Sequence, residues 1–407
     1  MLDRFGPWIL AGPVGRQTVL AAAGAVLAGA AVVAPAATAG ASPAPSAPAS
    51  SAGSSGAGPF IGGAQLAGRG VIVNYPPGRV PRLPGIKASA WVIADAGTGQ
   101  VLAAKDAHGW YRPASTLKVL TAISLIPVLS PDAMAVATKQ ATTVEPNLIG
   151  LQRGRAYKVS DLFTALLTIS ANDAAIALAQ ATGSLGKGMA VINAEARHLQ
   201  ADDTVAVTPS GLDAPGQHSS AYDLALFARQ GLRMPAFLKY DQTTGGLFRI
   251  SKKKSVGLWN QNTLLATYPG AIGGKIGWTS AAGATYVGMA RRHGVTLIVS
   301  LLQCPALTEI NAAKSLLNWG FAVDGKVRPV GTLVGPRQPA AASPSASASA
   351  HGDSVTGAAR SEAAGSGPSA LAAAGFSAVA LVAAGVGFAY GRRQRPEPRR
   401  RPLADRR

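Results

Sequence analysis

The chain contains one cysteine, Cys304, in 407 residues, so no intramolecular disulfide can form and the fold depends on its core alone. Cys304 ends an apolar run and lacks the His and Asn partner pattern of a nucleophilic thiol, which favours a buried structural role. The five histidines do not show the spacing of metal ligands. We therefore expect neither thiol chemistry nor a metal or other cofactor.

Acidic residues are also scarce, with 19 Asp and Glu against 38 Lys and Arg, for a net charge of +19. Residues 60–337 carry 27 basic and 14 acidic residues, and the last 17 residues carry 8 and 2. A charge spread in this way argues against a nucleic-acid site, whereas anionic polymers and lipid headgroups would attract it. The run Lys252-Lys253-Lys254 could contact such a polymer, although a solvated loop is the preferred interpretation.

The N-terminus has the pattern of an export signal over residues 1–39. Arg16 precedes an apolar stretch from Val19 to Val33, and Ala-Thr-Ala at residues 37–39 fits the small-residue cleavage pattern. Residues 40–59 are only Ala, Ser, Pro and Gly. Such a segment buries too little apolar surface to offset its ordering entropy, so it is predicted to be disordered.

The C-terminus has the pattern of a membrane anchor. Residues 338–368 form a second low-complexity segment, predicted to be a disordered linker with a reach of ~30 Å. Residues 369–390 are uncharged and mostly apolar, and at ~1.5 Å per residue a helix of this length crosses a bilayer core. Residues 391–407 are rich in Arg. By the positive-inside rule the tail is cytoplasmic and the domain at residues 60–337 lies outside the cell membrane, to which a single span anchors it.

The pattern of residues 60–337 predicts an α/β domain. Residues 88–104 read as a hairpin, and a second hairpin lies late in the chain at 284–303. Residues 160–181 and 306–321 have helical spacing. Early and late strands with helices between them predict one sheet shared by both ends of the domain, interrupted by a helical subdomain. A cleft between two such parts is a usual place for a ligand.

Three short polar motifs could supply chemistry. The first is Pro-Ala-Ser-Thr-Leu-Lys at residues 113–118, which opens an apolar helical run. Ser115 and Lys118 are three residues apart and share one helix face. A serine becomes a nucleophile when a base removes its proton, and Lys118 can be that base if burial or nearby positive charge lowers its pKa. An ordinary capped helix with a solvated lysine is the alternative.

The second motif, Ser170-Ala171-Asn172, interrupts a helical stretch with residues that suit helix interiors poorly. It supplies a hydroxyl that can pass a proton and an amide that can orient a substrate, unless it is only a helix boundary. The third is Lys275-Ile276-Gly277, expected on or beside an edge strand that lines the cleft. Lys275 could attract a carboxylate and help to depress the pKa of Lys118. Gly277 would admit a ligand backbone. An exposed lysine in a turn is the alternative.

Together the three motifs resemble those of the serine D-Ala-D-Ala carboxypeptidases, the low-molecular-mass penicillin-binding proteins of peptidase family S11. The resemblance covers most of residues 80–325 and includes Ser-Ala-Asn-Asp-Ala-Ala at 170–175 and Pro-Ser-Gly-Leu at 209–212. It implies a β-lactamase/transpeptidase-like fold, in which an antiparallel sheet is flanked by helices. It further implies peptidoglycan stem peptides as substrates and β-lactams as inhibitors.

The resemblance also implies roles for individual residues. Ser115 would attack the carbonyl between two terminal D-alanines, with Lys118 as proton acceptor. Ser170 would relay the proton to the leaving amine, and Asn172 would orient the substrate. The backbone N–H groups of Ser115 and Trp278 would form the oxyanion hole, and Lys275 and Thr279 would meet the terminal carboxylate.

Two departures from the family pattern keep alternatives open. Ile276 stands where the family usually has Thr, and loss of one such hydrogen bond costs on the order of 1 kcal/mol, about tenfold in rate. An Arg that some relatives place after the late strand is also missing. A catalytically impaired peptidoglycan-binding protein is therefore one alternative. A β-lactamase is another alternative. It would need a positioned carboxylate for rapid deacylation, and no Glu between Asn172 and Lys275 lies in a suitable motif, because Glu195 sits in an amphipathic helical pattern.

Overall fold

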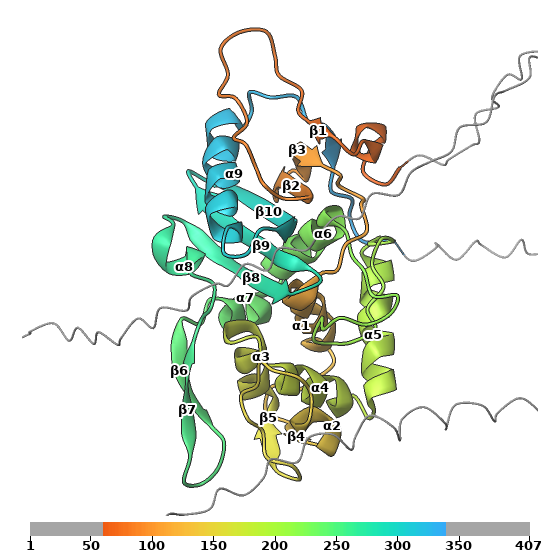
Figure 1. Cartoon of the computed structure of the whole chain (residues 1–407), viewed down its shortest axis with the longest axis vertical. Coiled ribbons are helices and arrows are strands. Elements are labelled where there is room, and N and C mark those ends of the chain that lie inside the picture. Colours follow the sequence, from red (N-terminus) through yellow and green to blue (C-terminus); the bar gives the residue numbers. More distant parts are fainter. Residues whose placement is uncertain (1–59, 339–407) are drawn as a thin grey trace, which may run out of the picture. The chain divides into compact units, whose positions relative to one another are not determined.

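The computed structural model describes residues 60–338 (Figure 1). The helical elements are η1 (Ala64–Ala67), η2 (Ala114–Leu117), α1 (Lys118–Leu125), α2 (Lys139–Thr142), α3 (Val159–Thr168), α4 (Asn172–Ala181), α5 (Leu185–His198), α6 (Ala221–Leu232), α7 (Pro235–Asp241), α8 (Leu264–Thr267) and α9 (Glu309–Val323). The strands are β1 (Val71–Ile72), β2 (Ala90–Asp95), β3 (Gln100–Lys105), β4 (Met134–Val136), β5 (Ala156–Lys158), β6 (Gly245–Arg249), β7 (Ser255–Trp259), β8 (Ala271–Thr279), β9 (Gly283–Arg292), β10 (Val295–Cys304) and β11 (Gly331–Thr332).

One antiparallel sheet joins the two ends of the domain. Its strand order is β1-β3-β2-β10-β9-β8, and β11 pairs with the first two residues of β3. Early β2 lies against late β10, with Leu297 opposite Asp95 and Leu302 opposite Ala90. Two further pairs, β4-β5 and β6-β7, stand apart from this sheet. The predicted sharing of one sheet by early and late segments is therefore confirmed.

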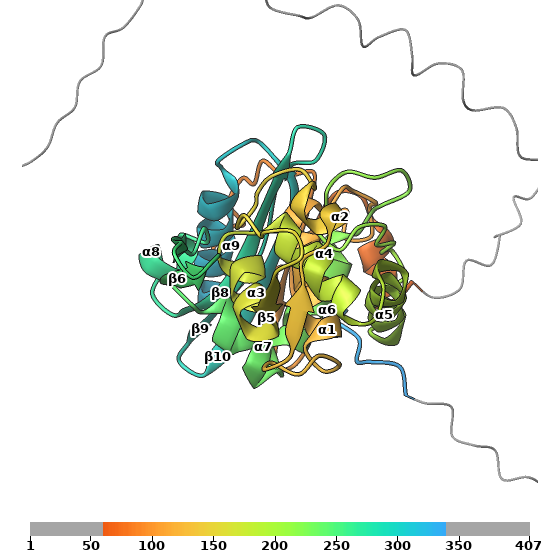
Figure 2. The same ribbon diagram turned by 90° about the horizontal axis from the view of Figure 1, so that it is seen from below.

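The sheet is buried on both faces because its central strands are apolar at successive positions. In β2, Trp91 and Ile93 pack in one hydrophobic cluster with α8 and α9. Val92 and Ala94, on the opposite face, pack in a second cluster with helices α1 and α3 to α6. Figure 2 shows the resulting layers, with α9 on one side of the strands and α1 and α6 on the other. A strand covered on both sides reads as a continuous apolar run.

Both predicted hairpins are confirmed, as β2-β3 and β9-β10. The helical stretch 160–181 is instead two helices, because Ser170 has a φ of 62° and ends the helical path after α3. The last predicted helix begins at Glu309 rather than at residue 306, since Gln303 and Leu307 both have positive φ and delay its start. The helical subdomain thus contains a break at the second polar motif.

The expectations for residues 1–59 and 339–407 lie outside the described residues. These are the export signal, the low-complexity segments, the membrane span and the basic tail. Within residues 60–338, no single helix is long and apolar enough to cross a bilayer, and α4 and α5 reach that length only together, across a bend of 94°.

Candidate active site

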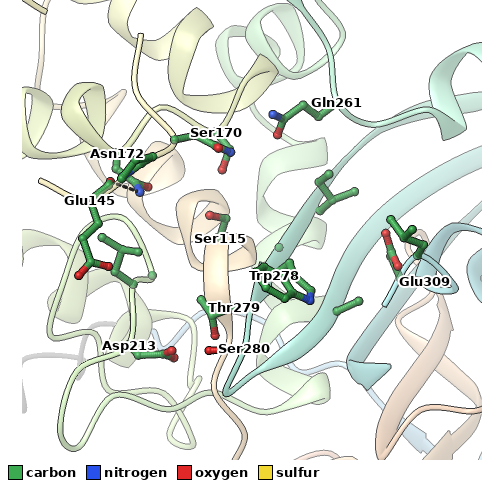
Figure 3. Close-up of a pocket in the computed structure, with 18 residues that line it drawn as sticks. Ser115, Glu145, Ser170, Asn172, Asp213, Gln261, Trp278, Thr279, Ser280 and Glu309 are labelled. Carbon is green, nitrogen blue, oxygen red and sulfur yellow. Dashed lines mark hydrogen bonds between the residues drawn. The ribbon is translucent and has the colours of Figure 1, made fainter. Parts of the chain in front are cut away.

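Ser115 lies at the floor of a cavity of about 760 Å³ between the sheet and the helical subdomain. It occupies the short turn η2, which leads directly into α1. The turn is fixed from two sides, because the Thr116 and Thr285 hydroxyls both donate to the Pro113 carbonyl, at 2.6 and 2.9 Å. Figure 3 shows Ser115 between Ser170 and Asn172 on one side and Trp278 on the other. The first two motifs therefore meet the third motif, on β8, around one cavity.

Lys118 is fully buried directly beneath Ser115. Its Nζ lies 2.8 Å from Ser115 Oγ, 2.7 Å from Asn172 Oδ1 and 2.6 Å from the Ser210 carbonyl oxygen. A neutral amine has two protons and one lone pair. If the protons go to the amide and carbonyl oxygens, which can only accept, the lone pair faces the Ser115 hydroxyl. The geometry is that of a base ready to accept the serine proton.

The pKa of Lys118 lies well below its usual value. Burial is the main cause, because the charged form loses its hydration, and the positive charge of Lys275 adds to it. The carboxylate of Asp173 acts in the opposite direction. A lower pKa increases the fraction of Lys118 in the neutral form, which is the form that a general base requires. A solvated lysine on a capped helix is excluded by this environment.

The Ser170-Ala171-Asn172 segment crosses the cleft wall between α3 and α4. Asn172 is buried. Its Oδ1 accepts a hydrogen bond from Lys118, and its Nδ2 donates one to the Glu145 carbonyl at 2.8 Å. The hydroxyl of Ser170 is buried, lines the cavity and has no hydrogen-bond partner among the described residues. Its left-handed backbone costs on the order of 1–3 kcal/mol. The left-handed residue thus places the Ser170 hydroxyl in the wall of the cavity that contains Ser115.

Asp173, the next residue, was not predicted to matter and holds the neighbouring loop in place. Its carboxylate accepts from the backbone N–H groups of Ile149, Gly150 and Leu151 at 2.9–3.0 Å. The same loop accepts a hydrogen bond from the Asn172 N–H at the Asn147 carbonyl, 2.7 Å away. One helix start thus positions both the amide beside Lys118 and the loop that closes this end of the cavity.

Gly277 brings β8 against the nucleophile turn. A Cβ added at this position would lie 2.4 Å from Thr285 Oγ1, 2.7 Å from the Ser115 backbone nitrogen and 3.0 Å from that of Thr116. The sequence predicted that Gly277 would admit a ligand backbone. The structure gives a further reason for the glycine, because the backbone that approaches it is that of Ser115 itself.

Lys275 is buried behind the cleft wall rather than exposed in a turn, and it is not among the residues lining the cavity. Its Nζ donates to the Ile276 carbonyl at 2.7 Å. Burial lowers the pKa of Lys275 to about 7, although the nearby Asp241 opposes this shift. Burial likewise raises the pKa of Asp241 to about 7, against the Gly274 N–H and Lys275. The alternative of an exposed lysine in a turn is therefore wrong, and Lys275 is a buried amine near the carboxyl group of Asp241.

The remaining members of the third motif line the cavity, namely Ile276, Gly277, Trp278 and Thr279. Trp278 is 61% exposed, and Ile276 presents a methyl-bearing side chain where a threonine would present a hydroxyl. The Thr279 Oγ1 accepts from the Ala282 N–H at 2.9 Å, so its own proton remains available.

Several residues that line the cavity were not predicted from the sequence. They are Glu145, Asn147, Gly211, Leu212, Asp213, Gln261, Ser280, Leu307 and Glu309. They come from loops far apart in the chain, and no local pattern marks them. The exception is the Pro-Ser-Gly-Leu segment, where a Cβ at Gly211 would lie 1.9 Å from the Ala114 carbonyl oxygen. The glycine in this motif could therefore have indicated that another backbone segment approaches it closely.

A serine activated by a buried lysine, with a second hydroxyl and an antiparallel strand across the cleft, defines the class of penicillin-recognising serine hydrolases. The family model described as D-alanyl-D-alanine carboxypeptidase, peptidase S11, matches residues 78–305, just over half of the chain. The chain belongs to this family and is a serine-type carboxypeptidase.

Individual relatives agree with this assignment. D-alanyl-D-alanine carboxypeptidase DacB2 of Mycobacterium tuberculosis is 39% identical over 264 residues, covering 63% of this chain and 90% of the relative. A solved D-alanyl-D-alanine carboxypeptidase from the same organism superposes with a TM-score of 0.60 at 38% identity, covering 63% of this chain and 99% of the other. DacD of Salmonella typhimurium is 33% identical, covering 59% of this chain and 64% of the relative.

Proposed function

We propose that this chain removes the terminal D-alanine from peptidoglycan stem peptides through an acyl-enzyme on Ser115. The observation that carries the proposal is the contact of 2.8 Å between Ser115 Oγ and the buried Nζ of Lys118. The family assignment supplies the reaction class, and the names of the relatives give D-alanyl-D-alanine as the bond cleaved.

In the acylation step, Lys118 Nζ takes the Ser115 hydroxyl proton as Oγ forms a bond to the penultimate D-alanine carbonyl carbon. The carbonyl oxygen becomes an oxyanion, which the backbone N–H groups of Ser115 and Trp278 would hold. The proton passes through the Ser170 hydroxyl to the departing amine, the C–N bond breaks, and free D-alanine leaves. Water then attacks the ester, giving Ser115 back its proton and releasing the shortened peptide.

Thr279, which lines the cavity, would contact the terminal carboxylate, whereas Lys275, buried behind the cavity wall, would attract it through its charge. Because Lys275 is buried with a pKa of about 7, substrate binding would draw a proton onto it: a carboxylate nearby stabilises the ammonium form. Carboxylate binding and the protonation of Lys275 would then be coupled. Asn172, held by Lys118 and by the Glu145 carbonyl, would orient the substrate amide with little loss of entropy.

Labelling with a fluorescent penicillin tests the acyl-enzyme. A stable label on the wild-type chain that disappears in Ser115→Ala supports the proposal, and mass spectrometry of the labelled peptide must place the adduct on Ser115. Rapid turnover of the label would favour the β-lactamase alternative. Absence of labelling by folded protein would favour the non-catalytic, peptidoglycan-binding alternative that Ile276 raises.

We also propose that the domain works outside the cell, anchored by the apolar segment at residues 369–390. Its support is the sequence alone, in which that segment precedes an Arg-rich tail. Protease added to intact cells should cut the domain, whereas a tag at the C-terminus should be protected until the membrane is permeabilised. A protected domain would contradict this topology.

A further inference from the structure

The hairpin β6-β7 stands outside the main sheet, and the proposed catalytic mechanism does not use it. It projects beside α3 beyond the body of the domain (Figure 1). Five residue pairs hold it in register, from Gly245 opposite Trp259 to Arg249 opposite Ser255. Its two faces differ in what they contact, because one packs on the domain and the other faces solvent.

The inner face anchors the hairpin to the subdomain. Phe248 and Leu258 are buried, and the Phe248 ring stacks on Tyr157 of β5 with centroids 5.6 Å apart. The Tyr157 hydroxyl also donates to the Ile250 carbonyl at 3.1 Å. The hairpin is thus fixed to the domain, so the orientation of its outer face is fixed as well.

The outer face presents large apolar side chains to solvent. Leu247 is 81% exposed and Trp259 is 77% exposed. Their cross-strand partners are Gly257 and Gly245, so no facing side chain covers them. The indole lies across Gly257, where an added Cβ would be 3.3 Å from Trp259 Nε1. Singly exposed apolar residues need no explanation, but here two share one narrow face.

The end of the same hairpin is purely basic. Arg249 and the run Lys252-Lys253-Lys254 are exposed, and residues 245–259 contain no Asp or Glu. None of the four forms a salt bridge with a described residue. Charge of one sign beside exposed Trp and Leu is the combination that binds the interface of an anionic bilayer: the cations meet headgroups, and the apolar groups enter the acyl boundary.

We propose that the β6-β7 hairpin is a membrane-docking element, with the surface of an anionic lipid bilayer as its partner. Complementary charge favours a polyanionic surface, and the exposed Leu247 and Trp259 favour lipid over a hydrated anionic polymer. The inference shares with the proposed function only the expectation that residues 369–390 anchor the chain. A span and a linker of ~30 Å reach would keep the hairpin close to such a surface.

The test uses residues 60–338, so that the apolar segment at 369–390 does not itself bind lipid. We expect a unit of this extent to fold alone, because a solved relative is matched over 99% of its own length by 63% of this chain. Cosedimentation is measured with vesicles of equal parts phosphatidylglycerol and phosphatidylcholine and with phosphatidylcholine alone. We expect binding to the anionic vesicles, with a blue shift of tryptophan fluorescence that W259F removes.

Two variants separate the contributions. Each cation near an anionic surface strengthens binding by about fivefold, so K252S/K253S/K254S should weaken it on the order of 100-fold. L247S/W259S should weaken it roughly tenfold or more, because apolar burial is lost. The matched control, R79S/K87S/K326S, removes the same charge from exposed positions outside the hairpin. Its affinity for the anionic vesicles should stay within a few fold of the wild-type affinity.

The proposal is overturned if the control loses as much as the lysine variant, or if wild-type protein binds both vesicles equally. It is also overturned if L247S/W259S binds like wild type, since the partner would then be a polyanion such as a cell-wall polymer. All these variants should release D-alanine from a soluble pentapeptide at the wild-type rate. Absence of release by the wild type would refute the proposed function and leave the vesicle result unaffected.

Discussion

Replacing Gly277 with alanine should separate the nucleophile from the strand that completes the cleft. The added Cβ would be 2.7 Å from the Ser115 nitrogen and 2.4 Å from Thr285 Oγ1, whereas ordinary contacts begin near 3.4 Å. The neighbours are backbone and a hydroxyl already bonded to Pro113, so neither side yields easily. Either β8 or the nucleophile turn must therefore move by about 0.7–1 Å.

A displacement of this size has a calculable effect. Misplacement of reacting groups by ~1 Å costs about 10²-fold in rate, and the Ser115 N–H is also an expected oxyanion donor. The second-order rate of penicillin acylation should thus fall roughly 10²- to 10³-fold in Gly277→Ala. Overpacking should cost a further 1–3 kcal/mol of unfolding free energy, measured by urea denaturation.

Gly246→Ala is the matched control, because it is also a strand glycine and a Cβ there meets nothing within 4 Å. It should acylate at the wild-type rate. If Gly277→Ala acylates as fast as Gly246→Ala while remaining folded, the close approach of β8 to Ser115 does not matter for acylation, and our reasoning about the oxyanion hole is wrong.

Four further changes test other parts of the site. Asn172→Asp places a carboxylate beside Lys118 and raises the pKa of that lysine, so acylation near neutral pH should fall at least tenfold and the acid limb of its pH profile should move to higher pH. Asp173→Ala should cost about 3–5 kcal/mol of unfolding free energy, because three N–H groups of residues 149–151 lose their acceptor. Ile276→Thr should raise the rate of D-alanine release by about tenfold if the missing hydroxyl contacts substrate. Asp241→Asn should flatten the pH dependence of stability between about pH 4 and 7. The pKa of Asp241 is raised from 3.8 to about 7 in the folded state, so its stabilising contribution is complete below 3.8 and is lost as pH rises through 7.

Each of these has a result that would count against it. An unchanged pH profile in Asn172→Asp would mean that Lys118 is not the base. Asp161→Ala, which removes an exposed Asp in the first turn of α3, is the control for Asp173→Ala and should change stability little. Equal rates for Ile276→Thr and wild type would show that the hydroxyl is dispensable. Equal pH slopes in Asp241→Asn and wild type would show that the buried carboxyl ionises normally.

Residues that act through local spacing could be predicted from the sequence. Ser115 and Lys118 are three apart on one turn, so their contact follows from helix geometry. The sharing of one sheet by β2 and β10 followed from two strongly patterned hairpins. Here local preference and the final fold agree, which is why the pattern was sufficient.

Features that depend on tertiary burial could not be predicted in this way. The sequence left open whether Lys275 faces the cleft or is exposed in a turn, and only the packing around β8 shows that it is buried near Asp241. The polar Ser170-Ala171-Asn172 segment indicated an interruption of the helix, but helical periodicity does not signal the left-handed backbone of Ser170 that produces it. The β6-β7 hairpin was not predicted because Leu247 and Trp259 face solvent and its glycines weaken the strand pattern.

The most direct test of the central claim is the release of D-alanine from a pentapeptide ending in D-Ala-D-Ala, measured for the full chain and for Ser115→Ala. We predict one D-alanine per peptide with wild-type protein, and none with Ser115→Ala at the same folded concentration. Release by Ser115→Ala at the wild-type rate, or no release by folded wild-type protein, would contradict the assignment of Ser115 as the nucleophile of a D,D-carboxypeptidase.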